Sequence, residues 1–169
     1  MLLLAVIAAT GVSVALALPT RERAAEWSGR VSEVTGTVTS SASIGQDGRL
    51  WFDAQTMTIG VRGRPAALSA PVRIGVEPGD GFDLGAQVRV AGQMQATEGG
   101  ERSALIVFAD DAEVVEPASG GFGVAAALKH AFVERSLRLP EPGAGLLPGL
   151  AVGDTRAVTP ELNADMRTS

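Results

Sequence analysis

Short apolar runs that alternate with polar residues fill segment 27–115, and they constrain the fold more than any other feature of the chain. In segment 87–95, Val88, Val90 and Met94 fall on one side of an extended strand, because successive side chains of a strand point to opposite faces. The same alternation marks three further segments: 29–39, 57–61 and 72–76. Glycine, proline and aspartate separate the runs and predict turns. The pattern predicts several short strands with no long helix among them.

Together with the apolar run at 105–108, these four segments make five strands and predict a mainly β fold, a small five-stranded OB-like barrel over residues 20–117. A β-sandwich usually has seven or more strands, whereas an SH3-like barrel has similar spacing and remains the main rival. Segment 105–108 is apolar throughout, which predicts a strand covered on both faces. Met57, Ile59 and Val61 are expected to share one face of their strand.

An uncharged apolar stretch occupies residues 2–18. As a helix it would be about 25 Å long, near the lower limit for spanning a bilayer. Its length predicts a transmembrane helix over residues 1–19. A cleaved secretory signal is the alternative, because Ala15-Leu16-Ala17 fits a small-x-small cleavage site, although no basic residue precedes Leu2. Charges of both signs follow the stretch, so the sequence leaves the membrane orientation open.

The composition excludes most catalytic machinery. The chain has no cysteine, which removes disulfides and thiolate metal sites, and its single histidine, His130, removes histidine-rich metal and triad sites. We therefore expect no enzyme, no cofactor and no metal site. The net charge of −5 also argues against a general polyanion binder.

OB barrels often bind single-stranded nucleic acid through basic grooves and stacking aromatic rings. Six residues are candidates for such contacts here: Arg30, Trp51, Arg62, Arg64, Arg73 and Arg89. Three of these arginines, at positions 62, 64 and 73, are expected to form a basic lip around one hairpin. Trp51 and Phe52 are neighbours in a strand, so only one of the two rings can face outward.

A structural interpretation of the same residues is the alternative. In it, one ring fills the core and the arginines keep the sheet soluble. The predicted barrel carries nine arginines against fourteen acidic residues, so the entire net charge of −5 falls within it. This charge balance favours the structural interpretation.

A linker and an amphipathic helix are predicted over residues 118–140. Leu128 and Phe132 fall near one side of that helix, and His130 and Glu134 fall on a polar stripe. Such a helix either covers a core or lies in a membrane interface, and the apolar segment upstream favours the interface.

The segment after this helix is an apolar loop constrained by proline and glycine. It contains the string Gly145-Leu146-Leu147-Pro148-Gly149-Leu150 and then Gly153-Asp154. This string resembles the entrance to the membrane-embedded competence domain of the ComEC family of DNA-internalisation proteins. The order of the other elements, an apolar N-terminal helix, a β-domain and a further helix, is similar to that family throughout the chain.

The resemblance implies that the chain is the N-terminal fragment of a ComEC-like bacterial membrane protein for uptake of single-stranded DNA during transformation. Residues 141–169 would be the truncated start of the competence (channel) domain. The barrel would lie outside the plasma membrane and guide single-stranded DNA to the channel. The implied partners are the membrane, single-stranded DNA, other proteins of the competence machinery and the missing channel domain.

The channel helices of the family would begin beyond residue 169, and its metallo-β-lactamase-like domain is absent from the chain. No metal or nuclease residue is therefore carried over from the resemblance. The alternative function is a membrane-anchored structural or protein-binding β-barrel with no nucleic-acid role.

Overall fold

The structure of the chain is a computed structural model that describes residues 20–61, 63–139, 147 and 151. The membrane helix expected over residues 1–19 lies outside this part of the chain, as does the start of the competence domain expected over 141–169, apart from positions 147 and 151. Within the described residues, no helix is both long enough and apolar enough to cross a membrane.

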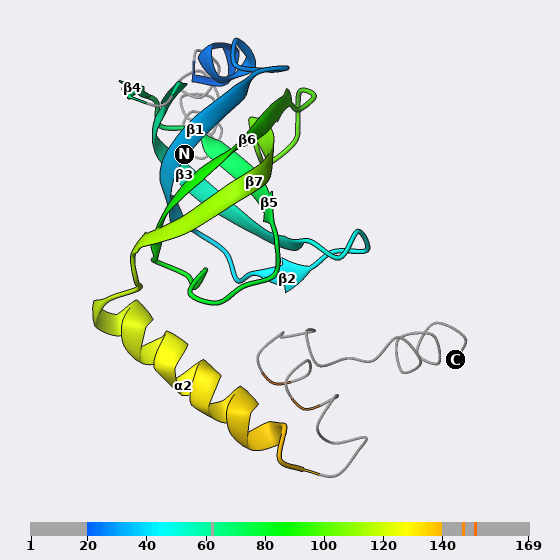
Figure 1. The fold of residues 1–169 in the computed structure, drawn as a ribbon, viewed down its shortest axis with the longest axis vertical. Coiled ribbons are helices and arrows are strands. Elements are labelled where there is room, and N and C mark those ends of the chain that lie inside the picture. Colours follow the sequence, from blue (N-terminus) through cyan, green and yellow to red (C-terminus); the bar gives the residue numbers. More distant parts are fainter. Residues whose placement is uncertain (1–19, 62, 140–146, 148–150, 152–169) are drawn as a thin grey trace, which may run out of the picture.

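Seven strands and one long helix follow a short helical stretch at residues 20–25 (Figure 1). In chain order they are β1 (Val31–Val38), β2 (Ser43–Ile44), β3 (Leu50–Val61), β4 (Arg64–Ala67), β5 (Pro71–Val76), β6 (Gln87–Ala96), β7 (Leu105–Glu116) and α2 (Gly120–Ser136). The strands β2 and β4 are short and pair only with β3. The other five strands form the body of the molecule.

These five strands close into a barrel. β1 pairs with β3, β3 with β5, β7 with β6, and β6 with β1, all antiparallel, while β5 and β7 pair in parallel. Counted along the chain, the barrel strands therefore follow the order 1-2-3-5-4 and return to 1. This is the Greek-key order of the OB fold, and it confirms the prediction of a mainly β, five-stranded OB-like barrel.

The barrel interior is filled by alternate residues of each strand. Val88, Val90 and Met94 of β6 are each 1 % exposed, as their alternation predicted. Phe52 of β3 is 2 % exposed, and its ring stacks on that of Phe82 at 5.3 Å. These inward residues make one continuous apolar core, whose burial is the main source of stability.

Two expectations about strand faces were wrong. Met57 is 42 % exposed and Val61 is 62 % exposed, whereas Ile59 between them is buried. For Met57 the cause is a bulge: a register shift between β1 and β3 leaves Met57 without a partner in the pairing with β1. Val61 lies beyond this bulge, at the very end of β3, where it pairs only with Arg64 of β4. Segment 105–108 is likewise covered on one face only, because its alternate residues are half-buried on the outside of the barrel.

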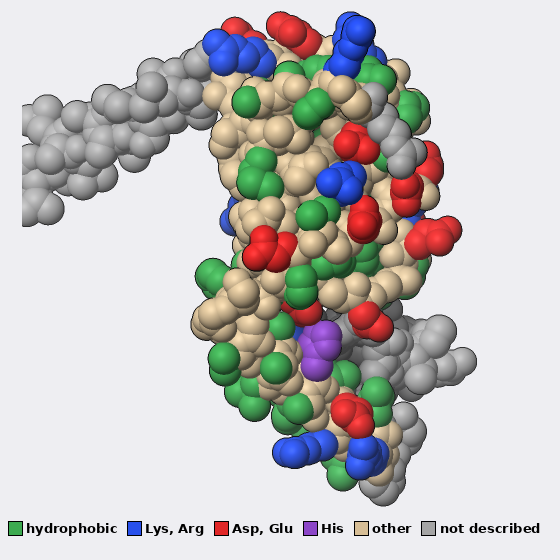
Figure 2. Space-filling model, turned by 60° about the vertical axis from the view of Figure 1, so that its left-hand side comes forward, with side chains coloured by type: hydrophobic (Ala, Val, Ile, Leu, Met, Phe, Trp, Pro, Cys, Tyr) green, Lys and Arg blue, Asp and Glu red, His purple; other side chains and the backbone are tan. Residues whose placement is uncertain are grey.

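The helix α2 confirms the predicted helix but not its amphipathic character. Apolar side chains lie on all sides of α2, and Val124 and Leu128 are each 71 % exposed. Figure 2 shows hydrophobic side chains along the visible face of the helix. α2 lies against one end of the barrel as far as His130, and the rest of the helix extends away from it (Figure 1). His130 reaches back to the loop before β6, where its Nε2 lies 3.1 Å from a carboxylate oxygen of Asp83.

Candidate nucleic-acid interface

An aromatic and cationic group lies on the outer face of β3, β5 and β7, with Trp51 at its centre. A side chain at Gly75, the direct partner of Trp51 on β5, would place its Cβ 2.8 Å from the indole. A Cβ at Gly45 would lie 2.5 Å from the other end of the same ring. The indole therefore occupies space that only glycine leaves open at both positions, and the two glycines set its position across the strands.

Two neighbouring side chains complete this group. The ring of Phe108, from β7, meets the Trp51 indole edge to face, with centroids 5.6 Å apart. The guanidinium carbon of Arg73, from β5, lies 5.6 Å from the centroid of the indole, in cation–π contact. We call Trp51, Arg73 and Phe108 the aromatic face. All three are on the outside of the barrel, and none of them is fully buried.

The turn before β3 anchors the indole. Asp47 accepts a hydrogen bond from Nε1 of Trp51 at 2.9 Å, and this bond holds the pKa of the Asp47 carboxyl below its ordinary value. The backbone N–H of Arg49 donates to the same oxygen at 3.2 Å. The Arg49 side chain donates to the backbone oxygens of Gly75 at 3.4 Å and Ala109 at 3.1 Å, so it links β3 to β5 and β7 beneath the aromatic face.

The Asp47–Trp51 bond predicts a pH response. Because the pKa of Asp47 is lowered in the folded chain, the bond stabilises the turn above the ordinary carboxyl range and is lost as the pH falls through the lowered value. In a Trp27→Phe background, the fluorescence of Trp51 is expected to stay constant on acidification and to change only below that range. Asp47→Asn should abolish this change in fluorescence. A change of the same size in the Asp47→Asn variant would show that another group causes it.

A shallow cleft adjoins the aromatic face. Its floor and walls come from β3, β5, β6, β7 and the loop between β6 and β7: Asp53, Arg73, Gln95, Ala96, Thr97, Glu98, Glu101, Arg102, Ser103 and Ile106. Arg21 holds this loop from the N-terminal helical stretch, because its guanidinium donates to the backbone oxygens of Glu101 and Ser103. Arg73 belongs to both the cleft and the aromatic face, so the two form one continuous surface.

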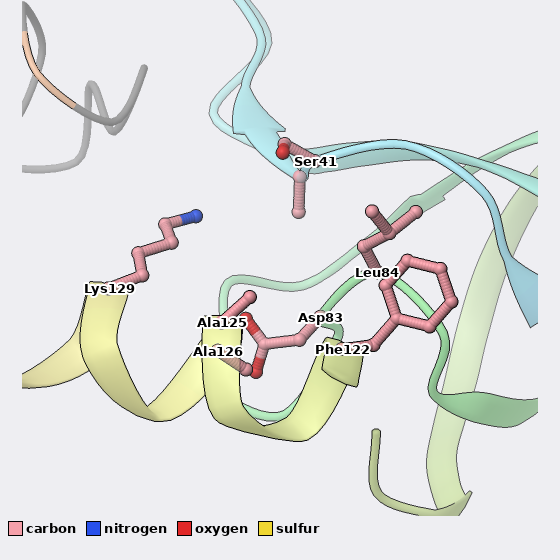
Figure 3. A pocket seen from close by; sticks show the side chains of 8 residues that line it. Ser41, Asp83, Leu84, Phe122, Ala125, Ala126 and Lys129 are labelled. Carbon is pink, nitrogen blue, oxygen red and sulfur yellow. The ribbon is translucent and has the colours of Figure 1, made fainter. Parts of the chain in front are cut away.

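A second hollow lies where α2 meets the barrel. Figure 3 shows Phe122, Ala125 and Ala126 of α2 facing Leu84 and Ser41 across it. Its lining is mostly apolar, and the Phe122 ring, the Lys129 amine and the Asp83 carboxylate lie at its edges without forming a set of catalytic groups. This hollow therefore marks the packing of α2 on the barrel end. No group of three or more histidine, aspartate or glutamate side chains in the described part of the chain could hold a metal ion.

The structure brings only two of the six predicted nucleic-acid residues together, Trp51 and Arg73. Arg64 pairs with Val61 at one end of β3, while Arg73 pairs with Asp53, eight residues away. At about 3.3 Å per residue the two arginines are roughly 26 Å apart along the strand, so they do not form one basic lip. Arg62, the third member expected in that lip, lies outside the described residues.

The remaining two candidates lie elsewhere on the barrel. Arg89 of β6 pairs with Glu113 of β7 at 3.1 Å and with Glu33 of β1 at 3.9 Å. Arg30 precedes β1, and its guanidinium carbon lies 5.8 Å from the ring centroid of Trp27. Neither arginine contacts the aromatic face.

The six predicted residues do not include Phe108, Arg49 or the polar residues of the cleft. Arg49 was predictable in part, because it lies two residues before Trp51 and so on the same side of an extended segment. Phe108 was not, because only the parallel pairing of β5 with β7 places it beside Gly75 and hence beside Trp51. The sequence carries no local signal for that pairing.

The charges around this surface nearly balance. Three arginines, Arg49, Arg73 and Arg102, lie in or beside this surface, together with four acidic residues: Asp47, Asp53, Glu98 and Glu101. Stacking on the two rings, supported by a few cations, is thus the chemistry that the surface offers, rather than a strong positive potential.

Fold and surface together define an OB-type barrel with an aromatic outer face on its second, third and fifth strands. No family model matches the chain, and no curated protein is similar to it. Among solved structures, the N-terminal domain of the PriB protein from Thermoanaerobacter tencongensis, described as dimeric, is similar. The two are 21 % identical, the match covers 50 % of this chain and 96 % of that one, and the TM-score is 0.32.

Proposed function

We propose that the barrel binds single-stranded nucleic acid across the aromatic face and the adjoining cleft. The observation that carries this proposal is the contact of Trp51 with both Arg73 and Phe108 on the outside of the barrel. A base can stack on such rings while a guanidinium contacts its phosphate. OB folds bind oligonucleotides on their second and third strands and on the loops that follow the first and fourth. In this chain those elements are β3, β5 and the loops 39–49 and 97–104.

The finer role follows from the resemblance of the segment 145–154 to the ComEC family. In that role the barrel receives single-stranded DNA and guides it to a membrane channel formed by further sequence. The near-neutral surface suits guiding, because a strand that is held mainly by stacking and few phosphate contacts dissociates readily.

A charge reversal at Arg73 tests the proposal against a matched control at Arg64. With a fluorescent mixed-sequence 12-mer at low salt, Arg73→Glu is expected to weaken binding about fivefold. The slope of the logarithm of the binding constant against the logarithm of the salt concentration is expected to fall in magnitude by about one. Arg64→Glu makes the same change of charge on an exposed residue of β4 and is expected to change the affinity less than about twofold. Fluorescence anisotropy over a salt series measures both quantities.

Two results would contradict the proposal. The first is the absence of any affinity for the single strand at low salt. The second is an equal loss for both variants, because this would mean that only the total charge of the barrel matters and not the aromatic face.

A structural or protein-binding barrel is the second candidate, and the surface of α2 favours it. Val124 and Leu128 are each 71 % exposed on a helix that extends away from the barrel. Exposed apolar side chains in a row are typical of contact surfaces. If the single strand does not bind and Leu128→Glu disrupts association with a channel-domain partner, this second function is the correct one.

A further inference from the structure

Asp53 is an acidic residue on the surface proposed to receive a polyanion. It lies two residues after Trp51 on β3, and therefore on the same side of the strand, and it lines the cleft. Arg73 is its direct partner on β5, yet no ion pair joins the two among the described residues. The Arg73 guanidinium lies beside the indole instead. The carboxylate of Asp53 is thus half-buried at the cleft wall, with no side-chain partner in this part of the molecule.

A carboxylate at this place repels phosphates, so it lowers the affinity for any strand in a way that does not depend on sequence. Toward the edge of a base, however, it is selective, because an ionised carboxylate accepts hydrogen bonds and cannot donate them. Ile106 offers an apolar contact for a base in the same cleft, and Gln95 on β6 offers an amide that both donates and accepts. The cleft therefore has a packing surface and two groups that can distinguish base edges.

We infer that Asp53 makes the barrel select guanine and reject thymine at one nucleotide next to the base stacked on Trp51. This inference rests on the proposed function. Guanine presents two adjacent donors, N1–H and the N2 amino group, which match the two oxygens of a carboxylate. Adenine and cytosine present one amino group beside an acceptor. Thymine presents a single N3–H between two carbonyl oxygens, which face the carboxylate and repel it.

The test uses the full 169-residue chain and labelled 12-mers that differ at a single central position. A dT12 strand is compared with the same strand carrying one central guanine, adenine or cytosine, so that no guanine run forms a folded structure. The wild-type chain is expected to bind the strand with guanine about five- to tenfold more tightly than dT12. The affinities for the strands with adenine and cytosine are expected to lie between those for the guanine strand and for dT12.

Asp53→Asn keeps the shape of the side chain but adds a donor and removes the charge. The variant is expected to bind dT12 more tightly than the wild type does and to show less than about a twofold preference for guanine. Asp110→Asn removes the same charge on an exposed residue of β7 that does not line the cleft, and it should retain the full preference. Thermal unfolding of both variants establishes that they fold.

Three results overturn the inference. The first is equal binding of all four strands by the wild-type chain, the second is tighter binding of dT12 than of the strand with guanine, and the third is a full preference for guanine in Asp53→Asn. If Trp51→Ala still weakens binding of the single strand in these cases, the proposed function stands without base selection. If no strand binds to the wild type at all, the proposed function fails and the inference fails with it.

Discussion

Replacing Trp51 with alanine is expected to weaken binding of single-stranded DNA by about 5- to 150-fold. The estimate follows from the loss of one stacked base, worth about 1–3 kcal/mol. Trp51 is the centre of the aromatic face, because it contacts both Phe108 and Arg73. Its removal leaves Arg73 without a cation–π partner and Phe108 without its ring contact. Anisotropy titration of a labelled strand measures the loss.

Two further variants separate stacking from general damage. Trp51→Phe keeps a π-face and is expected to recover most of the affinity, although it loses the bond to Asp47. Trp27→Ala removes the other tryptophan, which contacts Arg30 at the start of β1, and is expected to leave the affinity within about twofold. An undiminished affinity in Trp51→Ala would show that any strand binds on a different surface.

Replacing the next residue, Phe52, with alanine is expected to lower the free energy of unfolding by about 3–5 kcal/mol. Phe52 is 2 % exposed, and its ring stacks on Phe82 at 5.3 Å inside the barrel. The substitution leaves a cavity that the closed sheet cannot collapse, because five paired strands surround it. Chemical denaturation followed by circular dichroism measures the difference.

Val115→Ala provides the control for this loss. Val115 is also on a barrel strand but is 43 % exposed, so its truncation is expected to cost less than about 1 kcal/mol. Phe52→Ala should also retain the affinity of its folded fraction for the single strand. Equal losses of stability at positions 52 and 115 would contradict the assignment of Phe52 to the core.

The contrast between Trp51 and Phe52 shows how far the sequence determines the fold. The apolar patterning was sufficient to predict five barrel strands, because it reports burial along each strand. It marked only residues 57–61 of β3, however, and did not predict the short strands β2 and β4. It also predicted that one of the two rings faces outward. It did not show which one, since both rings are apolar and either face can be the inner one. The pairing of β3 with β5, with Phe52 opposite the buried Ile74, decides the question.

The candidate site was less predictable than the barrel, because it depends on pairings between distant segments. Arg64 and Arg73 are only nine residues apart in the sequence, yet β4 turns back along the end of β3 while β5 pairs with its beginning. Closeness in sequence therefore suggested a cluster that the strand register separates. The exposed position of Met57 has a similar origin, since a bulge in β3 opposite Gly36 cannot be inferred from alternation.

The helix α2 failed the amphipathic expectation for a different reason. The prediction rested on an apolar side with Leu128 and Phe132 and a polar stripe with His130 and Glu134, but alanines and valines make the remaining sides apolar as well. With apolar residues on all sides, α2 resembles a helix that is covered by other parts of an assembly.

The parallel pairing of β5 with β7 also determines when the aromatic face exists during folding. Trp51 and Phe108 are 57 residues apart in the sequence, and they meet only when the last strand joins the third strand of the barrel. Contacts of such long range form late, because a large chain loop must close before they are made. During synthesis the surface is therefore incomplete until β7 has left the ribosome, and the fluorescence of Trp51 reports the closure of the barrel itself.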